Sequence, residues 1–164
     1  MAQPLTGAVS KRLRPSAKAV IASDGRLLVI RMRDTRDGGE WLGLPGGGQR
    51  PGETIVDALR REVAEETGFL VEPIRLIWVR ELIIALRDDP RFNPEEHAIE
   101  MFFEARMVDD SGRPTEEDDD QVGVAWVTAA ELAASSFWPL ALVGPLSEHL
   151  RGGDTGPVYL GDVD

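Results

Sequence analysis

Residues 47–69 decide the fold of this chain, and they read GGQRPGETIVDALRREVAEETGF. Nine positions of this stretch follow the spacing Gly-x5-Glu-x7-Arg-Glu-U-x-Glu-Glu-x-Gly-U, in which U is a bulky apolar residue. These positions are Gly47, Glu53, Arg61, Glu62, Val63, Glu65, Glu66, Gly68 and Phe69. Because Gly, Glu and Arg each make up roughly a tenth of the chain, the seven exact matches arise by chance with a probability of only ~10⁻⁵ over all registers.

The stretch predicts a helix over residues 54–67, with Gly68 as its carboxy-terminal cap. Glu62, Glu65 and Glu66 then share one face, because they are three and four residues apart. That face continues a stripe that should be buried, formed by Ile55, Ala58, Leu59 and Val63. A Glu-rich helix is most often a solvated surface, but glutamates on a buried stripe are costly unless a cation neutralises them. Hard oxygen ligands of this kind favour Mg²⁺ or Mn²⁺.

The stretch from Gly47 to Phe69 resembles the signature of the Nudix hydrolases, and every defined position of that signature is met. The resemblance implies an α/β fold, an α/β/α sandwich around a mixed β-sheet. It also implies cleavage of the diphosphate linkage in a nucleoside diphosphate bonded to a moiety X, with Mg²⁺ as cofactor and Mn²⁺ as a substitute. A nucleoside triphosphate, ADP-ribose or a sugar nucleotide, and a dinucleoside polyphosphate stay open as substrates.

The signature also gives roles to individual residues. Glu62 and Glu65 are the candidate catalytic carboxylates, supported by Arg61 and by Glu53, which pair in the family and fix the shape of the loop and helix. The candidate metal ligands are the Gly47 carbonyl, Glu62, Glu65, Glu66 and, just before a predicted strand, Asp120. A carboxylate at Glu53 is also favoured by the helix dipole, because this residue lies near the start of the helix.

The signature does not by itself identify the general base or the residues that contact the substrate. In the family the base is either the glutamate that matches Glu62 or an acid from a loop outside the signature. The loop candidates here are Glu95, Glu96, Asp118, Asp119 and Asp120. Arg31 and Arg33, at the end of a predicted strand, are candidates for binding phosphates. Trp41 and Phe92, in or beside loops, are candidates for stacking on a base.

The composition narrows the class of protein. A net charge of −11 argues against binding nucleic acid through its phosphates, and a polyphosphate would be repelled unless divalent cations lay between it and the carboxylates. No apolar run approaches the ~18 residues of a membrane span. The absence of cysteine excludes disulfides and thiolate sites. We therefore expect a cytoplasmic protein with a small-molecule partner, and the choice between monomer and homodimer stays open.

The chain is predicted to form one domain over residues 17–164, after a flexible leader at 1–16 and with a mobile tail from 152. Strands are predicted over 18–23, 26–33, 41–44, 74–86, 98–108 and 122–127, with an Asp24-Gly25 hairpin between the first two. Thr128 and Glu131 predict a capping box for a short helix, and 138–150 a further helix with Pro145 as a potential break. Trp78, Trp126 and Trp138 are expected in the core.

A non-catalytic, nucleotide-sensing regulator with the same fold is the alternative function. Such proteins usually lose glutamates of the signature and often carry a nucleic-acid-binding domain. This chain keeps every glutamate of the signature, and no second domain is predicted within it. The sequence therefore favours the enzyme.

Overall fold

The computed structural model describes residues 13–35, 37–87, 95–115 and 119–164. Their helices and strands follow the chain in the order β1 (Leu13–Ser23), β2 (Arg26–Arg33), β3 (Glu40–Gly43), α1 (Ile55–Thr67), β4 (Leu70–Ile83), a 3₁₀ turn η1 (Ile84–Leu86), β5 (His97–Asp109), β6 (Gln121–Thr128), α2 (Ala129–Ala134), a 3₁₀ turn η2 (Leu140–Leu142), α3 (Val143–Leu150) and β7 (Tyr159–Asp162).

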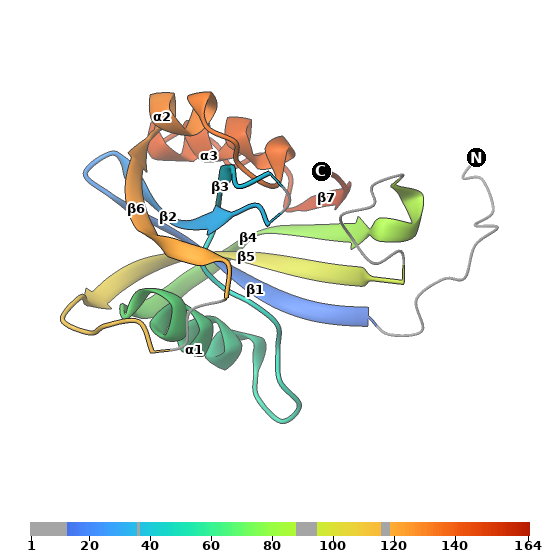
Figure 1. Ribbon diagram of the computed structural model, residues 1–164, viewed down its shortest axis with the longest axis horizontal. Coiled ribbons are helices and arrows are strands. Elements are labelled where there is room, and N and C mark those ends of the chain that lie inside the picture. The colour runs from blue at the N-terminus through green and yellow to red at the C-terminus, as the bar shows by residue number, and fades with distance from the viewer. Residues whose placement is uncertain (1–12, 36, 88–94, 116–118) are drawn as a thin grey trace.

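The strands form one seven-stranded mixed sheet in the order β3-β2-β1-β5-β4-β7, and β6 pairs with β2 off this path. β1 runs parallel to β5 and β4 parallel to β7, whereas the other pairs are antiparallel. Helix α1 lies on one side of the sheet and α2 and α3 lie on the other (Figure 1). The predicted α/β/α sandwich around a mixed sheet is therefore confirmed.

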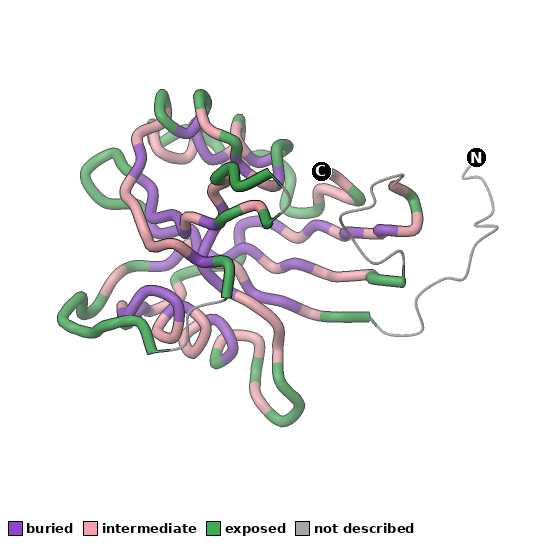
Figure 2. Tube along the Cα trace, in the orientation of Figure 1, coloured by how far each residue is buried: buried purple, intermediate pink, exposed green. Residues whose placement is uncertain are grey.

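Strand β1 is buried on both of its faces, which explains its almost uninterrupted apolar sequence. Successive side chains of a strand point to opposite sides of the sheet. Ala17, Ala19 and Ile21 pack with Leu59 and Val63 of α1. Val20 points the other way and joins a core cluster with Trp78, Phe102, Leu132, Leu142 and Leu146. The buried segments run through the middle of the sheet and along the inner side of α1 (Figure 2).

Helix α1 begins and ends at the residues that the sequence predicts. The Thr54 hydroxyl accepts a hydrogen bond from the Asp57 N–H at 3.1 Å, which caps the first turn. Gly68 ends the helix with φ of +77°, and its N–H donates to the Ala64 carbonyl at 2.9 Å. A Cβ at Gly68 would also lie 2.6 Å from the main chain of Arg113, so a larger residue is excluded there.

Three predicted boundaries differ from the structure. β1 begins at Leu13, inside the expected leader, because residues 13–16 extend the parallel pairing with β5. β4 begins at Leu70 instead of residue 74. The predicted helix over 138–150 is shorter and forms η2 followed by α3. Pro145 lies in the first turn of α3, where a missing N–H leaves no hydrogen bond unmade, so it does not break the helix.

The tail that was expected to be mobile instead forms part of the sheet. β7 pairs with β4, with Val79 opposite Tyr159 and Glu81 opposite Asp162. Two side chains of β4 also bind the main chain of this segment: Trp78 Nε1 donates to the Thr155 carbonyl at 2.7 Å and Arg80 Nη1 donates to the Val163 carbonyl at 2.8 Å. The sequence did not indicate this pairing because the partners lie about 80 residues apart, where local patterns carry no signal.

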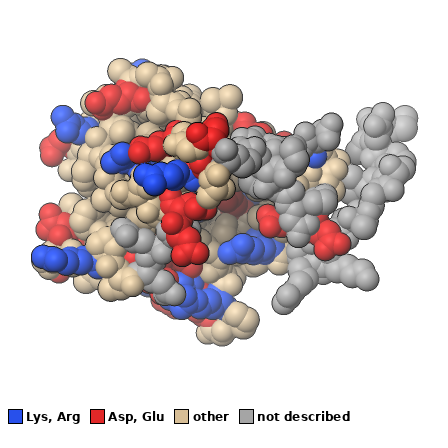
Figure 3. Space-filling model, in the orientation of Figure 1, with Lys and Arg blue, Asp and Glu red and all other residues tan. Residues whose placement is uncertain are grey.

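The visible surface carries charges of both signs. Figure 3 shows acidic side chains gathered near the middle of the face seen in Figure 1, with basic side chains interspersed among them. On this face the basic side chains form no continuous area, in line with the net charge of −11. None of the described helices is long and apolar enough to cross a membrane.

Removal of residues 155–164 should destabilise the whole domain, because it strips Arg80 of an acceptor and exposes the edge of β4. Loss of a partner for a buried charged group alone costs about 1–3 kcal/mol, and the lost strand pairing adds to that. We expect the free energy of unfolding in urea to fall by about 2–5 kcal/mol. As a control, Arg151→Ala, which removes only an exposed ion pair with Glu148, should change it by less than about 1 kcal/mol. A truncated protein of unchanged stability would contradict this role for the tail.

Candidate active site

The loop before α1 lies along β1 and is fixed to it through its main chain. The Ala17 N–H donates to the Gly47 carbonyl at 3.0 Å. Gly46 has φ of +129°, and a Cβ at this position would collide with the Ala17 carbonyl. Only glycine satisfies both the backbone conformation and the close approach to β1. The loop is therefore held in a defined position beside the glutamates of α1.

Arg61 is the centre of a network of carboxylates. Its guanidinium binds Glu53 through two nitrogens, Nε at 3.1 Å and Nη2 at 2.6 Å. Nη1 binds Glu62 at 2.6 Å and Glu65 at 3.0 Å, and Nη2 also donates to the Gly48 carbonyl at 3.0 Å. The pair between Arg61 and Glu53 that the resemblance implies is present. One guanidinium thus joins α1 to the loop that precedes it.

Glu66 is the most deeply buried carboxylate of α1, with 4% of its surface exposed. One of its oxygens accepts a hydrogen bond from the Gly46 N–H at 2.7 Å. Its main-chain carbonyl accepts a hydrogen bond from the side chain of Gln121 at 2.8 Å, which ties α1 to the start of β6. The carboxylate of Glu62 lies directly over Gly47, where any Cβ would collide with it. Gly47 is therefore needed to leave room for a glutamate.

The glutamates of α1 do not converge on one point, because Arg61 and the Gly46 N–H hold them. Among the described residues, no three Asp, Glu or His side chains form a ready metal site. The donor set nevertheless suits a divalent cation. Glu53, Glu62, Glu65 and Glu66 bring four carboxylates to this place, and Arg61 and Arg50 pair directly with three of them. Lys18, at the Gly46 carbonyl, and Arg14, beside Gly48, lie close by, and the carboxylates are the hard oxygen donors that Mg²⁺ prefers.

The pKa of Glu53 is shifted strongly by this network. Hydrogen bonds from Arg61 are the main cause, and a hydrogen bond from the Arg50 N–H adds to them, so that the pKa of Glu53 falls from 4.5 to about 2. The pKa of Arg61 is raised, first by its hydrogen bond with Glu53 and further by Glu62 and Glu65. Both groups are therefore charged throughout the neutral range, and their pairing is permanent there.

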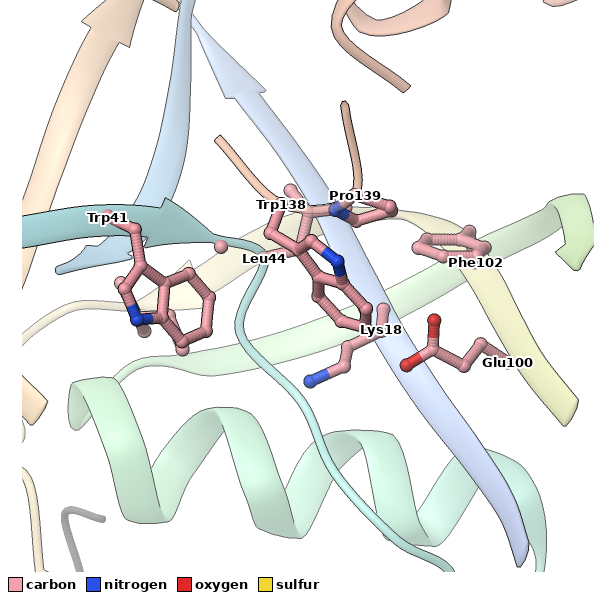
Figure 4. A pocket seen from close by; sticks show the side chains of 9 residues that line it. Lys18, Trp41, Leu44, Glu100, Phe102, Trp138 and Pro139 are labelled. Carbon is pink, nitrogen blue, oxygen red and sulfur yellow. The ribbon is translucent and has the colours of Figure 1, made fainter. Parts of the chain in front are cut away.

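A pocket lies on the face of the sheet opposite α1 (Figure 4). It is lined by Lys18, Ile30, Trp41, Gly43, Leu44, Glu100, Phe102, Trp138 and Pro139 and encloses about 320 Å³ including its open mouth. Trp41 and Trp138 meet edge to face, with ring centres 6.5 Å apart. Lys18 Nζ donates a hydrogen bond to the Gly46 carbonyl. Because Gly46 also binds Glu66, the pocket adjoins the carboxylate network.

Three residues of this pocket were not predicted as functional. Trp138 was expected in the core but is only half buried and forms a wall of the pocket. Lys18 and Glu100 are charged residues next to apolar runs of β1 and β5, and both side chains line the pocket (Figure 4). A charge that interrupts a buried strand was the signal available in the sequence. Trp41, a candidate for stacking on a base, also lines the pocket.

Arg31 and Arg33 do not line the pocket, and phosphate binding by them stays a prediction. Ile30 points into the pocket, and the alternation along β2 turns Arg31 away from it. Arg31 instead binds Glu40 at 2.7 Å, and Arg33 is exposed. Phe92, the other candidate for stacking on a base, lies outside the described residues.

The loop acids lie at two separate places. Asp120 is exposed and directly precedes Gln121, which contacts the last turn of α1, so it remains a candidate near the carboxylate network. Asp119 is its exposed neighbour, and Asp118 lies outside the described residues. Glu95 and Glu96 are exposed and directly precede β5, where it pairs with the far end of β4. There β5 also pairs with Leu13 of β1, and Pro15, two residues on, binds Gln49 of the loop before α1.

Comparison with known proteins agrees with this geometry. Residues 12–143 match the NUDIX domain family. The nucleoside triphosphatase NudI of Enterobacter sp. (strain 638) is 32% identical over 127 residues, which cover 74% of this chain and 86% of NudI. The 8-oxo-dGDP phosphatase NUDT18 of Mus musculus is 47% identical over 55 residues, 34% of this chain.

The match to NUDT18 covers 17% of the mouse protein, and the chain matches less than half the length of the first curated relatives. Among solved structures, a NUDIX hydrolase from Nitrosomonas europaea superposes with a TM-score of 0.70 at 24% identity, covering 87% of this chain and 92% of the other. The likeness in structure extends well beyond the signature, over nearly the whole described domain.

The lowered pKa of Glu53 predicts how stability depends on pH. The carboxylate binds Arg61 only when ionised, so this contribution is complete above the ordinary pKa of 4.5 and is lost as pH falls toward about 2. In urea denaturation between about pH 5 and pH 2, Glu53→Gln should therefore lose stability less steeply than the wild type. In an Arg61→Met background the same change should leave the slope unaltered. Equal slopes for the wild type and E53Q would refute the pairing.

Proposed function

The chain belongs to the Nudix hydrolase family, and we propose that it is a Mg²⁺-dependent pyrophosphohydrolase that cleaves the diphosphate linkage of a nucleoside diphosphate bonded to a moiety X. The observation that carries the proposal is the carboxylate network beside the loop, in which Arg61 binds Glu53, Glu62 and Glu65 and the Gly46 N–H binds Glu66. This network adjoins a pocket with aromatic walls. A phosphate chain and a base could thus occupy neighbouring sites.

The residues that would hold the metal are the glutamates of α1 and the loop beside them. Glu62, Glu65 and Glu66, the Gly47 carbonyl and, from the turn before β6, Asp120 are the ligands of this proposal. Mg²⁺ prefers such oxygen ligands, and Mn²⁺ could replace it. When bound, a divalent metal neutralises charge on the phosphate oxygens and activates the attacking water.

Each residue around the metal has a separate task. Arg61 and Glu53 hold the loop against α1, and their permanent pairing keeps Glu62 and Glu65 in reach of the phosphates. In this structure both glutamates bind Arg61 Nη1, so they must turn from it to bind a cation, whereas Glu53 keeps two contacts with the guanidinium. Glu62, which lies over Gly47, is the preferred base for taking a proton from water.

The pocket suits the nucleoside of the substrate. Trp41, Trp138 and Phe102 offer apolar surface for a base, and Lys18 bridges the pocket and the loop next to the glutamates. The names of the relatives, a nucleoside triphosphatase and an 8-oxo-dGDP phosphatase, support a nucleotide as substrate. A nucleoside triphosphate, ADP-ribose or a sugar nucleotide, and a dinucleoside polyphosphate are the candidates for X.

Glu62→Gln and Glu66→Gln should each lower kcat by about 100-fold or more at saturating Mg²⁺ without unfolding the protein. Each change removes a charge that faces the phosphates yet keeps the size of the side chain. Phosphate and pyrophosphate release from a panel of nucleotides, with product masses, measures the effect. Chelation with EDTA should stop turnover, and added Mg²⁺ should restore it.

The matched control is Glu72→Gln, a half-buried glutamate of β4 that is bound by Arg60 away from this network, and it should retain full activity. Near-normal activity in both E62Q and E66Q would overturn the assignment of these residues. Binding of nucleotides without any turnover by the wild type would instead favour the sensing regulator.

A further inference from the structure

The pocket contains a buried ion pair that the proposed catalysis does not use. Arg80 of β4 is fully buried, and its Nε binds Glu100 Oε2 of β5 at 2.5 Å. Glu100 is 6% exposed and lines the pocket. Burying two charges is costly and is seldom the best way to stabilise a fold. Because this pair lies in the wall of a pocket, a role in binding a ligand explains it better than a role in stability.

The carboxy-terminal segment holds Arg80 in place. Nη1 donates to the Val163 carbonyl at 2.8 Å, and the guanidinium lies 4.4 Å from the ring centre of Trp138. Trp138 Nε1 in turn donates to the Asp164 carboxylate at 2.7 Å. Nη2 of Arg80 is buried and has no partner among the described residues. The arginine is thus fixed on three sides, and it fixes the orientation of Glu100.

The second oxygen of Glu100 is available to a ligand. Among the described residues no donor binds Oε1, and this oxygen is not one of the buried atoms without a partner, so it is open to the pocket. Lys18 lies on the neighbouring strand and points into the same space (Figure 4), but Glu100 pairs with Arg80 and not with Lys18. The pocket therefore presents a carboxylate acceptor and an ammonium donor side by side, near aromatic rings.

From this arrangement we infer that Glu100 selects a base with two adjacent N–H donors next to a carbonyl, which is the edge of guanine. One of the N1–H and 2-amino donors would bind the open Oε1 of Glu100, the other would bind the second lone pair of Oε2 beside Arg80, and Lys18 would donate to O6. Adenine and cytosine place a ring-nitrogen acceptor beside their amino group, and uracil has one N–H between two carbonyls. Each of these would set an acceptor against the carboxylate. The inference rests on the proposed function, because it takes this pocket as the site of the nucleoside.

The first test uses the wild-type protein with GTP, ITP and ATP in the presence of Mg²⁺. ITP has the guanine edge without its 2-amino group, so its use leaves one acceptor of Glu100 unpaired. Sites built to hydrogen-bond a group reject analogues that lack it. We expect kcat/KM for ITP to be about 10- to 100-fold below that for GTP, and ATP to be poorer still. Equal values for GTP and ITP would overturn the inference.

The second test replaces Glu100 with glutamine, which offers one acceptor and one donor. Glu100→Gln should remove most of the preference for GTP over ITP, whereas Glu104→Gln, the same change two positions further along this face of β5, should keep it. A preference that survives in E100Q shows that another group reads the base and also overturns the inference. If E100Q does not fold, the comparison of GTP with ITP in the wild type decides alone.

Calorimetric binding of GDP, IDP and ADP separates this inference from the proposed function. Tighter binding of GDP than of IDP, without turnover of any triphosphate, sugar nucleotide or dinucleoside polyphosphate, supports the role of Glu100 and refutes the hydrolase. Turnover of several triphosphates without discrimination supports the hydrolase and refutes the role of Glu100. Failure of every nucleotide to bind at about 1 mM, the weak end of ordinary ligand affinity, also refutes the inference.

Discussion

The arrangement of the candidate active site depends on the contact between Arg61 and Glu53. Without it, the loop before α1 would be held to the helix by few other side chains, and three further carboxylates would repel one another across a short distance. The guanidinium is suited to this role because its planar fork binds one carboxylate through two nitrogens and still has donors for Glu62 and Glu65. A lysine at this position could not make all of these contacts.

The same contact explains how the acidic helix is tolerated before any cation binds. Glu66 is the only one of the α1 glutamates that is almost fully buried, and a main-chain N–H of the loop compensates part of its desolvation. Glu62 and Glu65 are partly exposed and depend on Arg61. The pairing is incomplete, because one guanidinium serves three carboxylates. After folding, glutamates that are only partly paired with arginine therefore remain together beside the loop that precedes α1.

The sequence predicted the parts of the structure that depend on local patterns. The cap at Thr54, the positive φ at Gly68 and the Asp24-Gly25 turn each follow from a few adjacent residues, and all are present. The tail at β7 and the pocket could not be predicted in this way. Arg80 meets Glu100 and Val163 only after β4, β5 and the carboxy-terminal segment have paired. Nothing near Arg80 in the sequence indicates that it is buried.

Strand β1 connects the two halves of the candidate site. The main chain of Ala17 and Ala19 holds the loop at Gly47 and Pro45, while Ala17 and Ala19 turn their side chains toward α1. Lys18, between them, points to the opposite face and binds the Gly46 carbonyl. A shift of one residue in the register of β1 would move the lysine into the α1 core and separate the loop from the pocket. The spacing between the carboxylate network and the pocket is therefore set by the pleat of a single strand.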